Sequence, residues 1–167
     1  MLIAIKHNMY IKEFEIRWSD LDANLHLGNS KYIDYMSHTR MSFLAENNLD
    51  LDVMFKNNLG PITLHEHIHY FKEIKPRETV SVSLEVSGHS EDGRFLMFEH
   101  NFYNSEGKNL AYAEILFSWI DIKKRKIGIV SKELLTIIES FPRSNSFKHL
   151  TKKELKEKIV IPNDLPK

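Results

Sequence analysis

Apolar and polar residues alternate most regularly over residues 79–87, where every second position from Val80 to Val86 is apolar. Side chains of a strand point alternately to its two faces, so this period of two predicts a half-buried β-strand. The Asp92-Gly93 pair that follows is typical of a hairpin turn. Less regular alternation predicts four more strands, over residues 10–18, 62–74, 95–103 and 109–122.

A helical period separates the first two of these four strands. Between Ser30 and Asn47, apolar residues recur at helical spacing, which predicts an amphipathic helix. Its N-cap is expected at Asn29 or Ser30, and Asp34 in the first turn would suit the helix dipole. The apolar positions are Tyr32, Ile33, Met36, Phe43 and Leu44.

The order of the elements predicts the fold class. One strand, a long helix and then a run of antiparallel strands indicate an α+β fold, in which the helix packs against a curved sheet. A short helical turn is expected within residues 48–60, and a helix over residues 131–141 ends at Pro142. We expect one domain over residues 1–142, followed by a polar, lysine-rich tail over residues 143–167 with a short helix at 151–158.

Charge and composition exclude several kinds of function. The 23 basic and 23 acidic residues cancel, whereas nucleic-acid-binding domains usually carry a basic excess. The chain has no cysteine, which excludes disulfides, thiolate metal sites and cysteine nucleophiles and fits a cytoplasmic protein. The apolar run before Lys6 is too short for a signal peptide or a membrane span. We therefore expect a cytoplasmic protein without a membrane span and without a nucleic-acid partner.

A cluster of chemically capable groups stands between the first strand and the long helix. Asp22, Asn24 and His26 occupy alternate positions just before the expected start of the helix. A carboxylate and an imidazole are acid–base groups, and the free N–H groups of a helix N-terminus favour a developing negative charge. A base, its orienting partners and an oxyanion donor in one place are the parts of a hydrolytic site.

The segment from Ser19 to Ile33 resembles the start of hotdog-fold thioesterases of the acyl-ACP and 4-hydroxybenzoyl-CoA thioesterase groups. In the acyl-ACP enzymes it typically carries Asp-x-Asn-x-His, followed three residues later by Asn. The matching residues here are Asp22, Asn24, His26 and Asn29. The resemblance covers residues 10–122 and implies a single hotdog domain, in which a curved antiparallel sheet of five or six strands wraps one long central helix.

The same resemblance implies roles for individual residues. It implies that Asp22, Asn24 and His26 are catalytic, and that Glu73 is catalytic as well, because the run from Tyr70 has the family's Tyr-x-x-Glu spacing. In the CoA-specific relatives the carboxylate equivalent to Asp22 is the key group, and a backbone N–H at the helix start polarises the thioester carbonyl. Substrate contacts are expected from Asn29, Ser30 and Tyr32.

The function that the resemblance implies is that of an acyl-thioester hydrolase. Such an enzyme releases a carboxylic acid, here expected to be a fatty acid, from acyl-CoA or acyl-ACP by carboxylate-assisted attack of water, and it needs no cofactor. Plant acyl-ACP thioesterases carry two hotdog units in tandem, whereas this chain has one, and Gly28 stands where Asn is common. We therefore expect a homodimer or a dimer of dimers. Two alternatives stay open: a hydratase or dehydratase acting on enoyl or hydroxyacyl thioesters, and a non-catalytic acyl-CoA-binding protein.

Three histidines form a second cluster. His65, His67 and His69 alternate along an expected strand and would share one face of it. Imidazoles suit divalent metals, but the helical His-Glu-x-x-His zinc pattern is absent and no further ligand is defined. A polar strand face near a dimer contact is the favoured interpretation, and no metal site is expected.

Overall fold

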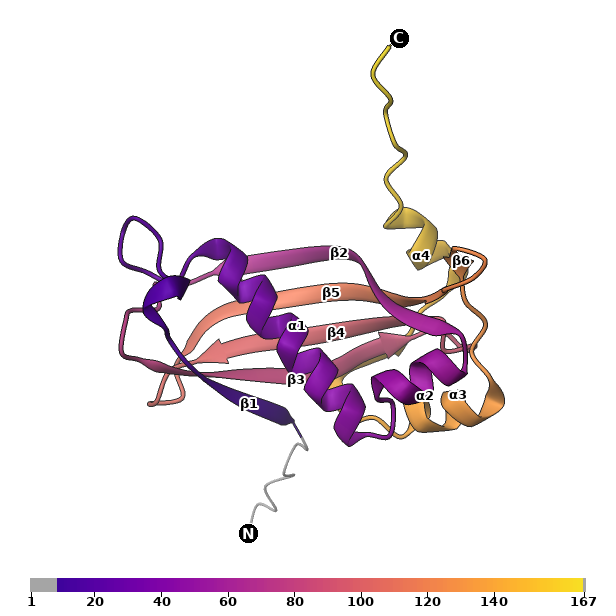
Figure 1. Ribbon diagram of the computed structural model, residues 1–167, viewed down its shortest axis with the longest axis horizontal. Coiled ribbons are helices and arrows are strands. Elements are labelled where there is room, and N and C mark those ends of the chain that lie inside the picture. Colours follow the sequence, from indigo (N-terminus) through magenta and orange to yellow (C-terminus); the bar gives the residue numbers. More distant parts are fainter. Residues whose placement is uncertain (1–8, 167) are drawn as a thin grey trace.

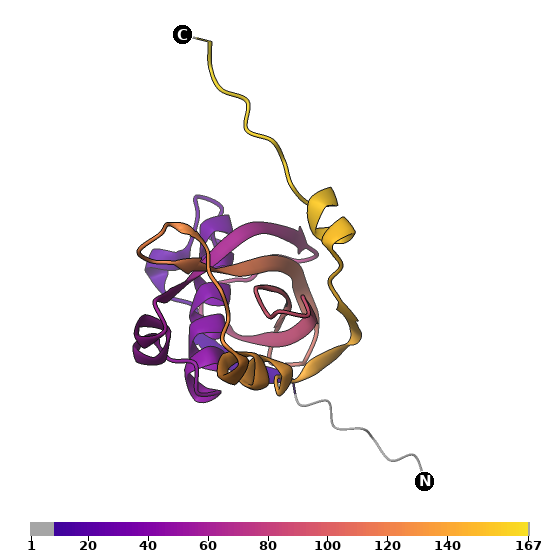
Figure 2. The same cartoon turned by 90° about the vertical axis from the view of Figure 1, so that its right-hand side faces the viewer.

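A curled sheet wraps one long helix in the computed structural model, which describes residues 9–166 (Figure 1). Seen end-on, the sheet forms a half-barrel around this helix, as the hotdog resemblance predicts (Figure 2). The apolar run before Lys6 lies outside the described residues. The helices are α1 (Asn29–Glu46), α2 (Leu51–Lys56), α3 (Lys132–Glu139) and α4 (Lys152–Glu157), with a short 3-10 helix η1 (Trp18–Asp20).

Five antiparallel strands form the main path of the sheet, in the order β1-β3-β4-β5-β2. Two short strands add to this path. β6 pairs with β5, and β7 lies parallel to β3, so the sheet has seven strands rather than the five or six expected. The strands are β1 (Tyr10–Glu15), β2 (Leu59–Tyr70), β3 (Thr79–His89), β4 (Phe95–Tyr103), β5 (Asn109–Asp121), β6 (Lys126–Ile127) and β7 (Arg143–His149).

The core lies between α1 and the inner face of the sheet. Phe43 on α1 packs edge-on against Phe98 of β4, and Tyr32 packs against Phe102, with ring centroids 6.5 Å and 5.0 Å apart. The helical period seen in the sequence is therefore confirmed at these positions. Ile33 is the exception, because it is 40% exposed on the side of α1 that faces away from the core.

The start of α1 differs from the expected one. Gly28 is the N-cap, Asn29 is the first helical residue, and the first turn holds no acidic side chain, so Asp34 does not interact with the helix start as expected. The reason is tertiary. The Leu27 N–H donates to the Ile74 carbonyl at 2.8 Å and the Gly28 N–H donates to a carbonyl of the preceding loop, which keeps the chain extended through Gly28.

The segment after Pro142 is more ordered than a polar tail. Residues 143–149 form β7, which the sequence analysis did not predict, and the short helix expected over residues 151–158 is present as α4. A capping box between Thr151 and Glu154 starts α4, because each side chain satisfies a backbone N–H of the other residue. Within residues 9–166, none of the helices combines the length and the apolar character that crossing a membrane requires.

Candidate active site

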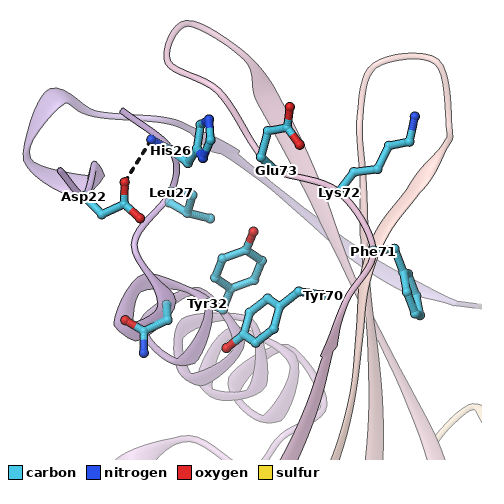
Figure 3. A pocket seen from close by; sticks show the side chains of 9 residues that line it. Asp22, His26, Leu27, Tyr32, Tyr70, Phe71, Lys72 and Glu73 are labelled. Atoms are coloured by element: carbon cyan, nitrogen blue, oxygen red, sulfur yellow. Dashed lines mark hydrogen bonds between the residues drawn. The ribbon is translucent and has the colours of Figure 1, made fainter. Parts of the chain in front are cut away.

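One cavity of about 330 Å³ lies where the loop before α1 meets the segment that follows β2 (Figure 3). The two walls come from parts of the chain that are far apart in sequence, and the start of α1 forms the floor between them. The lining residues are Asp22, His26, Leu27, Asn29, Tyr32, Tyr70, Phe71, Lys72 and Glu73.

The loop before α1 turns back on itself and so brings Asp22 next to His26. The Asp22 N–H donates to the His26 carbonyl at 2.8 Å, and the Leu25 N–H donates to the Asp22 carbonyl at 3.0 Å. Leu25 has a φ of 59°, in the left-handed region that side chains with a Cβ seldom adopt, and this allows the tight reversal. Leu21 and Leu27 pair on either side of the turn.

The carboxylate of Asp22 is held in a fixed orientation by the same turn. Its Oδ1 accepts the backbone N–H of Asn24 at 2.8 Å. The same oxygen accepts the backbone N–H of His26 at 3.2 Å (Figure 3). Oδ2 takes part in neither bond. A carboxylate that is oriented through one oxygen and exposed through the other is suited to accept a proton from water or to attack a carbonyl carbon.

Asp20 fixes the loop to the rest of the fold. This carboxylate is 7% exposed, and its Oδ2 accepts the Arg17 N–H at 2.9 Å and the Tyr35 hydroxyl at 2.8 Å. Its backbone carbonyl accepts the Gly28 N–H at 2.9 Å. A buried carboxylate is tolerated when such bonds satisfy it, so Asp20 has a structural role that joins the loop to α1.

The start of α1 supplies backbone donors to the floor of the cavity. The first N–H groups of a helix have no partner within the helix, and the Gly28 cap offers no side-chain acceptor for them. Asn29 lines the cavity at this point. The N–H groups of Asn29 and Ser30 therefore form, with the helix dipole, a favourable place for a carbonyl oxygen that gains negative charge.

Glu73 faces the loop from the opposite wall. Its own backbone N–H and the nearby Lys75, whose Nζ lies 3.5 Å from Oε1, lower the pKa of the Glu73 carboxyl, and His26 lowers it further. The carboxyl therefore remains ionised at neutral pH. Glu73 and His26 are close enough to interact electrostatically across the cavity.

Tyr32 places a neutral hydroxyl inside the cavity. Its ring packs edge-on against Tyr70 with the centroids 5.0 Å apart. Burial, together with the nearby Tyr70, Asp22 and Glu73, raises the pKa of Tyr32 to about 12. The hydroxyl is therefore protonated at neutral pH and acts as a donor. In Figure 3 it points towards the side of the cavity that His26 and Glu73 line.

The structure brings together most of the residues singled out in the sequence. Asp22, His26, Asn29, Tyr32 and Glu73 line the one cavity. Asn24 and Ser30 are exposed and lie outside its lining; Asn24 contributes the backbone N–H that holds Asp22. The lining also includes Leu27, Tyr70, Phe71 and Lys72. The last three belong to the Tyr-x-x-Glu run that pointed to Glu73, which was the available signal.

The three histidines of β2 lie on the outer face of the sheet. His67 stands opposite Glu114 of β5 and His69 stands opposite Tyr112, on the face away from the buried Ala113. The rings of His65 and His67 are 6.2 Å apart. Within the described part of the chain, no three His, Asp or Glu side chains are arranged to hold a metal ion.

Comparison with known proteins agrees with this fold. A family model described as the thioesterase-like superfamily matches residues 16–160, and the search of curated proteins gave no match. SAV2348 from Staphylococcus aureus, solved in complex with CoA, is 19% identical with a TM-score of 0.74; the match covers 93% of this chain and 97% of that one. A 1,4-dihydroxy-2-naphthoyl-CoA thioesterase from Synechocystis is 16% identical with a TM-score of 0.69, over 79% of this chain and 96% of that one.

A DHNA-CoA thioesterase from Staphylococcus aureus is similar as well, at 17% identity and a TM-score of 0.71, over 78% of this chain and 87% of that one. These identities are low, so the structural matches speak for the fold. The family model is the stronger finding, because it spans most of the chain, including the loop before α1 and the segment after β2. The chain therefore belongs to the thioesterase-like superfamily and is an enzyme of the thioesterase class.

Proposed function

We propose that this protein hydrolyses an acyl thioester of CoA or of acyl carrier protein, releasing a carboxylic acid and a thiol. The observation that carries the proposal is the convergence of Asp22, Glu73 and the start of α1 on one cavity. Thioester hydrolysis needs an activated water, a stabilised oxyanion and a leaving thiolate, and the two walls and the floor of the cavity offer a group for each.

Asp22 is the proposed base or nucleophile. As a base, it takes a proton from water while the water oxygen bonds to the carbonyl carbon; the C–S bond then breaks and the sulfur leaves as a thiolate. As a nucleophile, it first forms an acyl anhydride that water opens. The two backbone bonds to Oδ1 leave Oδ2 free for either step.

The oxyanion is the part that α1 stabilises in this proposal. The N–H groups of Asn29 and Ser30 face the carbonyl oxygen, and the Tyr32 hydroxyl supplies a further donor from inside the cavity. Ser30 acts through its backbone, since its side chain is exposed outside the lining. Loss of one such donor typically costs about 3–4 kcal/mol of the activation barrier.

His26 and Glu73 have supporting roles in the proposal. Glu73 is an ionised carboxylate that faces His26 across the cavity, so it is placed to orient the His26 ring. In the base route, the proton that Asp22 takes from water passes by way of His26 to the departing thiolate. Asn24 acts through its backbone N–H, which orients Asp22.

The acyl carrier and the assembly complete the proposal. The CoA bound to the similar SAV2348 favours CoA as the carrier. A second copy of the chain would supply the second hotdog unit, which plant acyl-ACP thioesterases carry in tandem on one chain. β2 is the favoured edge for pairing with it, because its end residue Tyr70 lies in the wall of the cavity.

The test is release of free thiol from a panel of acyl-CoA and acyl-ACP thioesters, with wild type beside Asp22→Asn. The asparagine keeps the Oδ1 acceptor and therefore the turn, so the fold stays intact while kcat falls by about 10²–10⁴. Asp52→Asn on α2 is the matched control and keeps wild-type activity, because Asp52 is an exposed carboxylate outside the cavity.

Other outcomes point to the alternatives. Hydration of an enoyl-CoA without thiol release would indicate a hydratase. Binding of acyl-CoA that Asp22→Asn leaves unchanged, without turnover by the wild type, would indicate an acyl-binding protein. Full activity of Asp22→Asn would refute the assignment of the base and move it to His26 or Glu73.

A further inference from the structure

A second cavity lies at the other end of the junction between α1 and β2. It has a volume of about 220 Å³. We call it the Arg40 cavity, after the one charged side chain that lines it within the described part of the molecule. Its lining residues are Ser37, Arg40, Met41, Pro61, Thr63 and Phe117.

Arg40 is a buried cation with incomplete hydrogen bonding. The residue is 4% exposed, its Nη2 donates to the Ser37 hydroxyl at 3.0 Å, and its Nη1 lies 3.4 Å from Nε2 of His100. The nearest carboxylate oxygen is Oε1 of Glu66 at 3.7 Å, which is too far for a hydrogen bond. A guanidinium has five N–H donors, so these contacts leave part of its capacity unused.

The neighbours of Arg40 show which charges balance it. His100 is fully buried, and its Nδ1 lies 2.7 Å from the Ser83 carbonyl, which can only accept. Nδ1 is therefore the protonated nitrogen, and Nε2 faces Arg40 as an acceptor, so the ring is neutral. Among residues 9–166, Glu66 is the one carboxylate that pairs with Arg40, and its Oε1 is buried without a hydrogen-bond donor.

The group that best fits between Arg40 and Glu66 is a neutral one that both accepts and donates a hydrogen bond. A hydroxyl next to Nη2 accepts from Arg40 and donates to Glu66, which satisfies both buried groups without adding charge. A carboxylate would meet Glu66 at short range, and repulsion between like charges in a buried site is costly. A methyl group would leave both polar groups unpaired.

The junction between the two cavities runs along α1. The helix and β2 are antiparallel, since Tyr32 meets Tyr70 at one end and Met41 shares the Arg40 cavity with Pro61 at the other. Arg40 is eleven residues after Asn29, or about 16 Å along the helix axis. Ile33 and Ile68 lie between the ends; Ile33 is exposed and Ile68 is half-buried against the core.

We propose that the Arg40 cavity recognises a hydroxyl group at the far end of a long acyl chain whose thioester lies at the start of α1. This inference rests on the proposed function and narrows its substrate class to long-chain acyl groups that carry a distal hydroxyl. The acyl chain lies along the junction between α1 and β2, past Ile33 and Ile68, and Arg40 and Glu66 are the specificity-determining residues.

The first experiment uses the wild-type protein alone. kcat/KM is measured for dodecanoyl-, tetradecanoyl- and hexadecanoyl-CoA, each ending in a methyl, a hydroxyl or a carboxyl group. At the chain length that reaches Arg40, we expect the hydroxyl substrate to exceed the methyl substrate by about tenfold or more, because a site built to bind a hydroxyl rejects the analogue without it. The carboxyl substrate is expected to be the poorest.

A second experiment changes the charge next to Arg40. Glu66→Gln keeps the shape of the side chain and removes its negative charge, so the carboxyl substrate becomes the preferred one and the hydroxyl advantage shrinks. Glu114→Gln is the matched control. It removes a carboxylate from the outer face of the neighbouring strand and keeps the wild-type ranking.

The outcomes separate this inference from the proposed function. Hydrolysis of methyl-ended substrates with no hydroxyl preference at any length overturns the role of the Arg40 cavity alone. A wild type that prefers the carboxyl substrate, or a Glu66→Gln ranking identical to the wild type, does the same. Absence of thiol release from every member of the panel overturns the proposed function and this inference with it.

Discussion

Three acidic residues near the cavity differ in what holds them, and this difference separates their roles. Asp20 is buried and receives a tyrosine hydroxyl and a backbone N–H on one oxygen, so it serves the fold. Glu73 is exposed and paired with Lys75. Asp22 combines a fixed Oδ1 with an unengaged Oδ2. A carboxylate oxygen with fixed direction and free electron pairs is what water activation requires, which is why we assign that step to Asp22.

The Tyr32 hydroxyl is expected to contribute to catalysis as a neutral donor. Tyr32→Phe keeps the ring that packs against Tyr70 and Phe102 and removes only the donor, so kcat is expected to fall by about 10²- to 10³-fold with little change in KM. Because the pKa of Tyr32 is about 12, the hydroxyl stays protonated well above neutral pH. The ratio of wild-type to variant kcat should therefore stay constant from neutral pH up to about 10.

Tyr112→Phe is the control for this measurement. Tyr112 lies on the outer face of β5, outside the cavity lining. Removal of its hydroxyl is expected to leave kcat unchanged. An equal loss in both variants would indicate a general effect on the fold. No loss in Tyr32→Phe would remove the hydroxyl from the oxyanion site.

Asn24→Ala tests whether the second residue of the Asp-x-Asn-x-His pattern acts through its side chain. The structure uses the backbone N–H of Asn24, which alanine retains, and the side chain is exposed. We therefore expect kcat/KM within about threefold of wild type, the range of an ordinary surface substitution. A loss comparable to that of Asp22→Asn would show that the Asn24 amide reaches the substrate.

At the level of helices and strands, the hydrophobic pattern of the sequence predicted those elements whose formation depends on nearby residues. The period of two from Val80 to Val86 gave β3, and the helical spacing gave α1 to within one residue at each end. The start of α1 was misjudged because Gly28 is held by bonds to distant residues rather than by a side-chain cap. β7 has a polar sequence and pairs with an irregular part of β3, so no hydrophobic alternation marks it.

In the candidate site too, residues close together in sequence could be predicted, whereas residues brought together by the fold could not. Asp22 and His26 are close in sequence, so a motif could identify them, and Glu73 entered only through a family spacing. Tyr70, Phe71 and Lys72 stand in the same run as Glu73 but carried no signal of their own. The polar contact between α1 and β4 was also hidden, because Arg40 interrupts a helix stripe that the apolar spacing alone would fill.

That polar contact predicts how stability depends on pH. Burial and the neighbouring Arg40 guanidinium lower the pKa of His100 to about 3, from about 6.5 in the unfolded chain. The unfolded chain therefore binds one more proton than the fold between these values. The stability due to neutral His100 is fully present above about 6.5 and is lost as the pH falls towards 3, by at most about 1.4 kcal/mol per pH unit.

His100→Gln tests this dependence. The glutamine amide can donate to the Ser83 carbonyl and accept from Arg40, yet it does not titrate. Urea unfolding midpoints measured from neutral pH down to about 4 should fall more steeply for wild type than for the variant. Parallel pH profiles for the two proteins would contradict the prediction, whatever the stability of the variant at neutral pH.

At the scale of the whole molecule, the two free edges of the sheet are unlike each other. β1 has six residues and carries Lys12, Glu13 and Glu15, which is how natural proteins protect an edge from pairing. β2 has twelve residues, exposes Leu64 and Tyr70, and carries one acidic and no Lys or Arg side chain. The long, weakly charged β2 edge is therefore the one suited to pair with a second copy of the chain.

Leu64→Lys is expected to separate such copies and to lower activity. Leu64 is 43% exposed and stands at the irregular point of β2 between Thr63 and His65, so a charge there reaches solvent in a monomer but would be buried against a second β2. Ile11→Lys on β1 introduces the same charge at a residue that is 49% exposed and should keep the wild-type assembly. Analytical ultracentrifugation gives the mass of each protein, and thiol release gives its activity. Because Tyr70 at the end of β2 lines the cavity, loss of the partner should raise KM as well as reduce the mass; a Leu64→Lys protein with the wild-type mass would exclude β2 as the pairing edge.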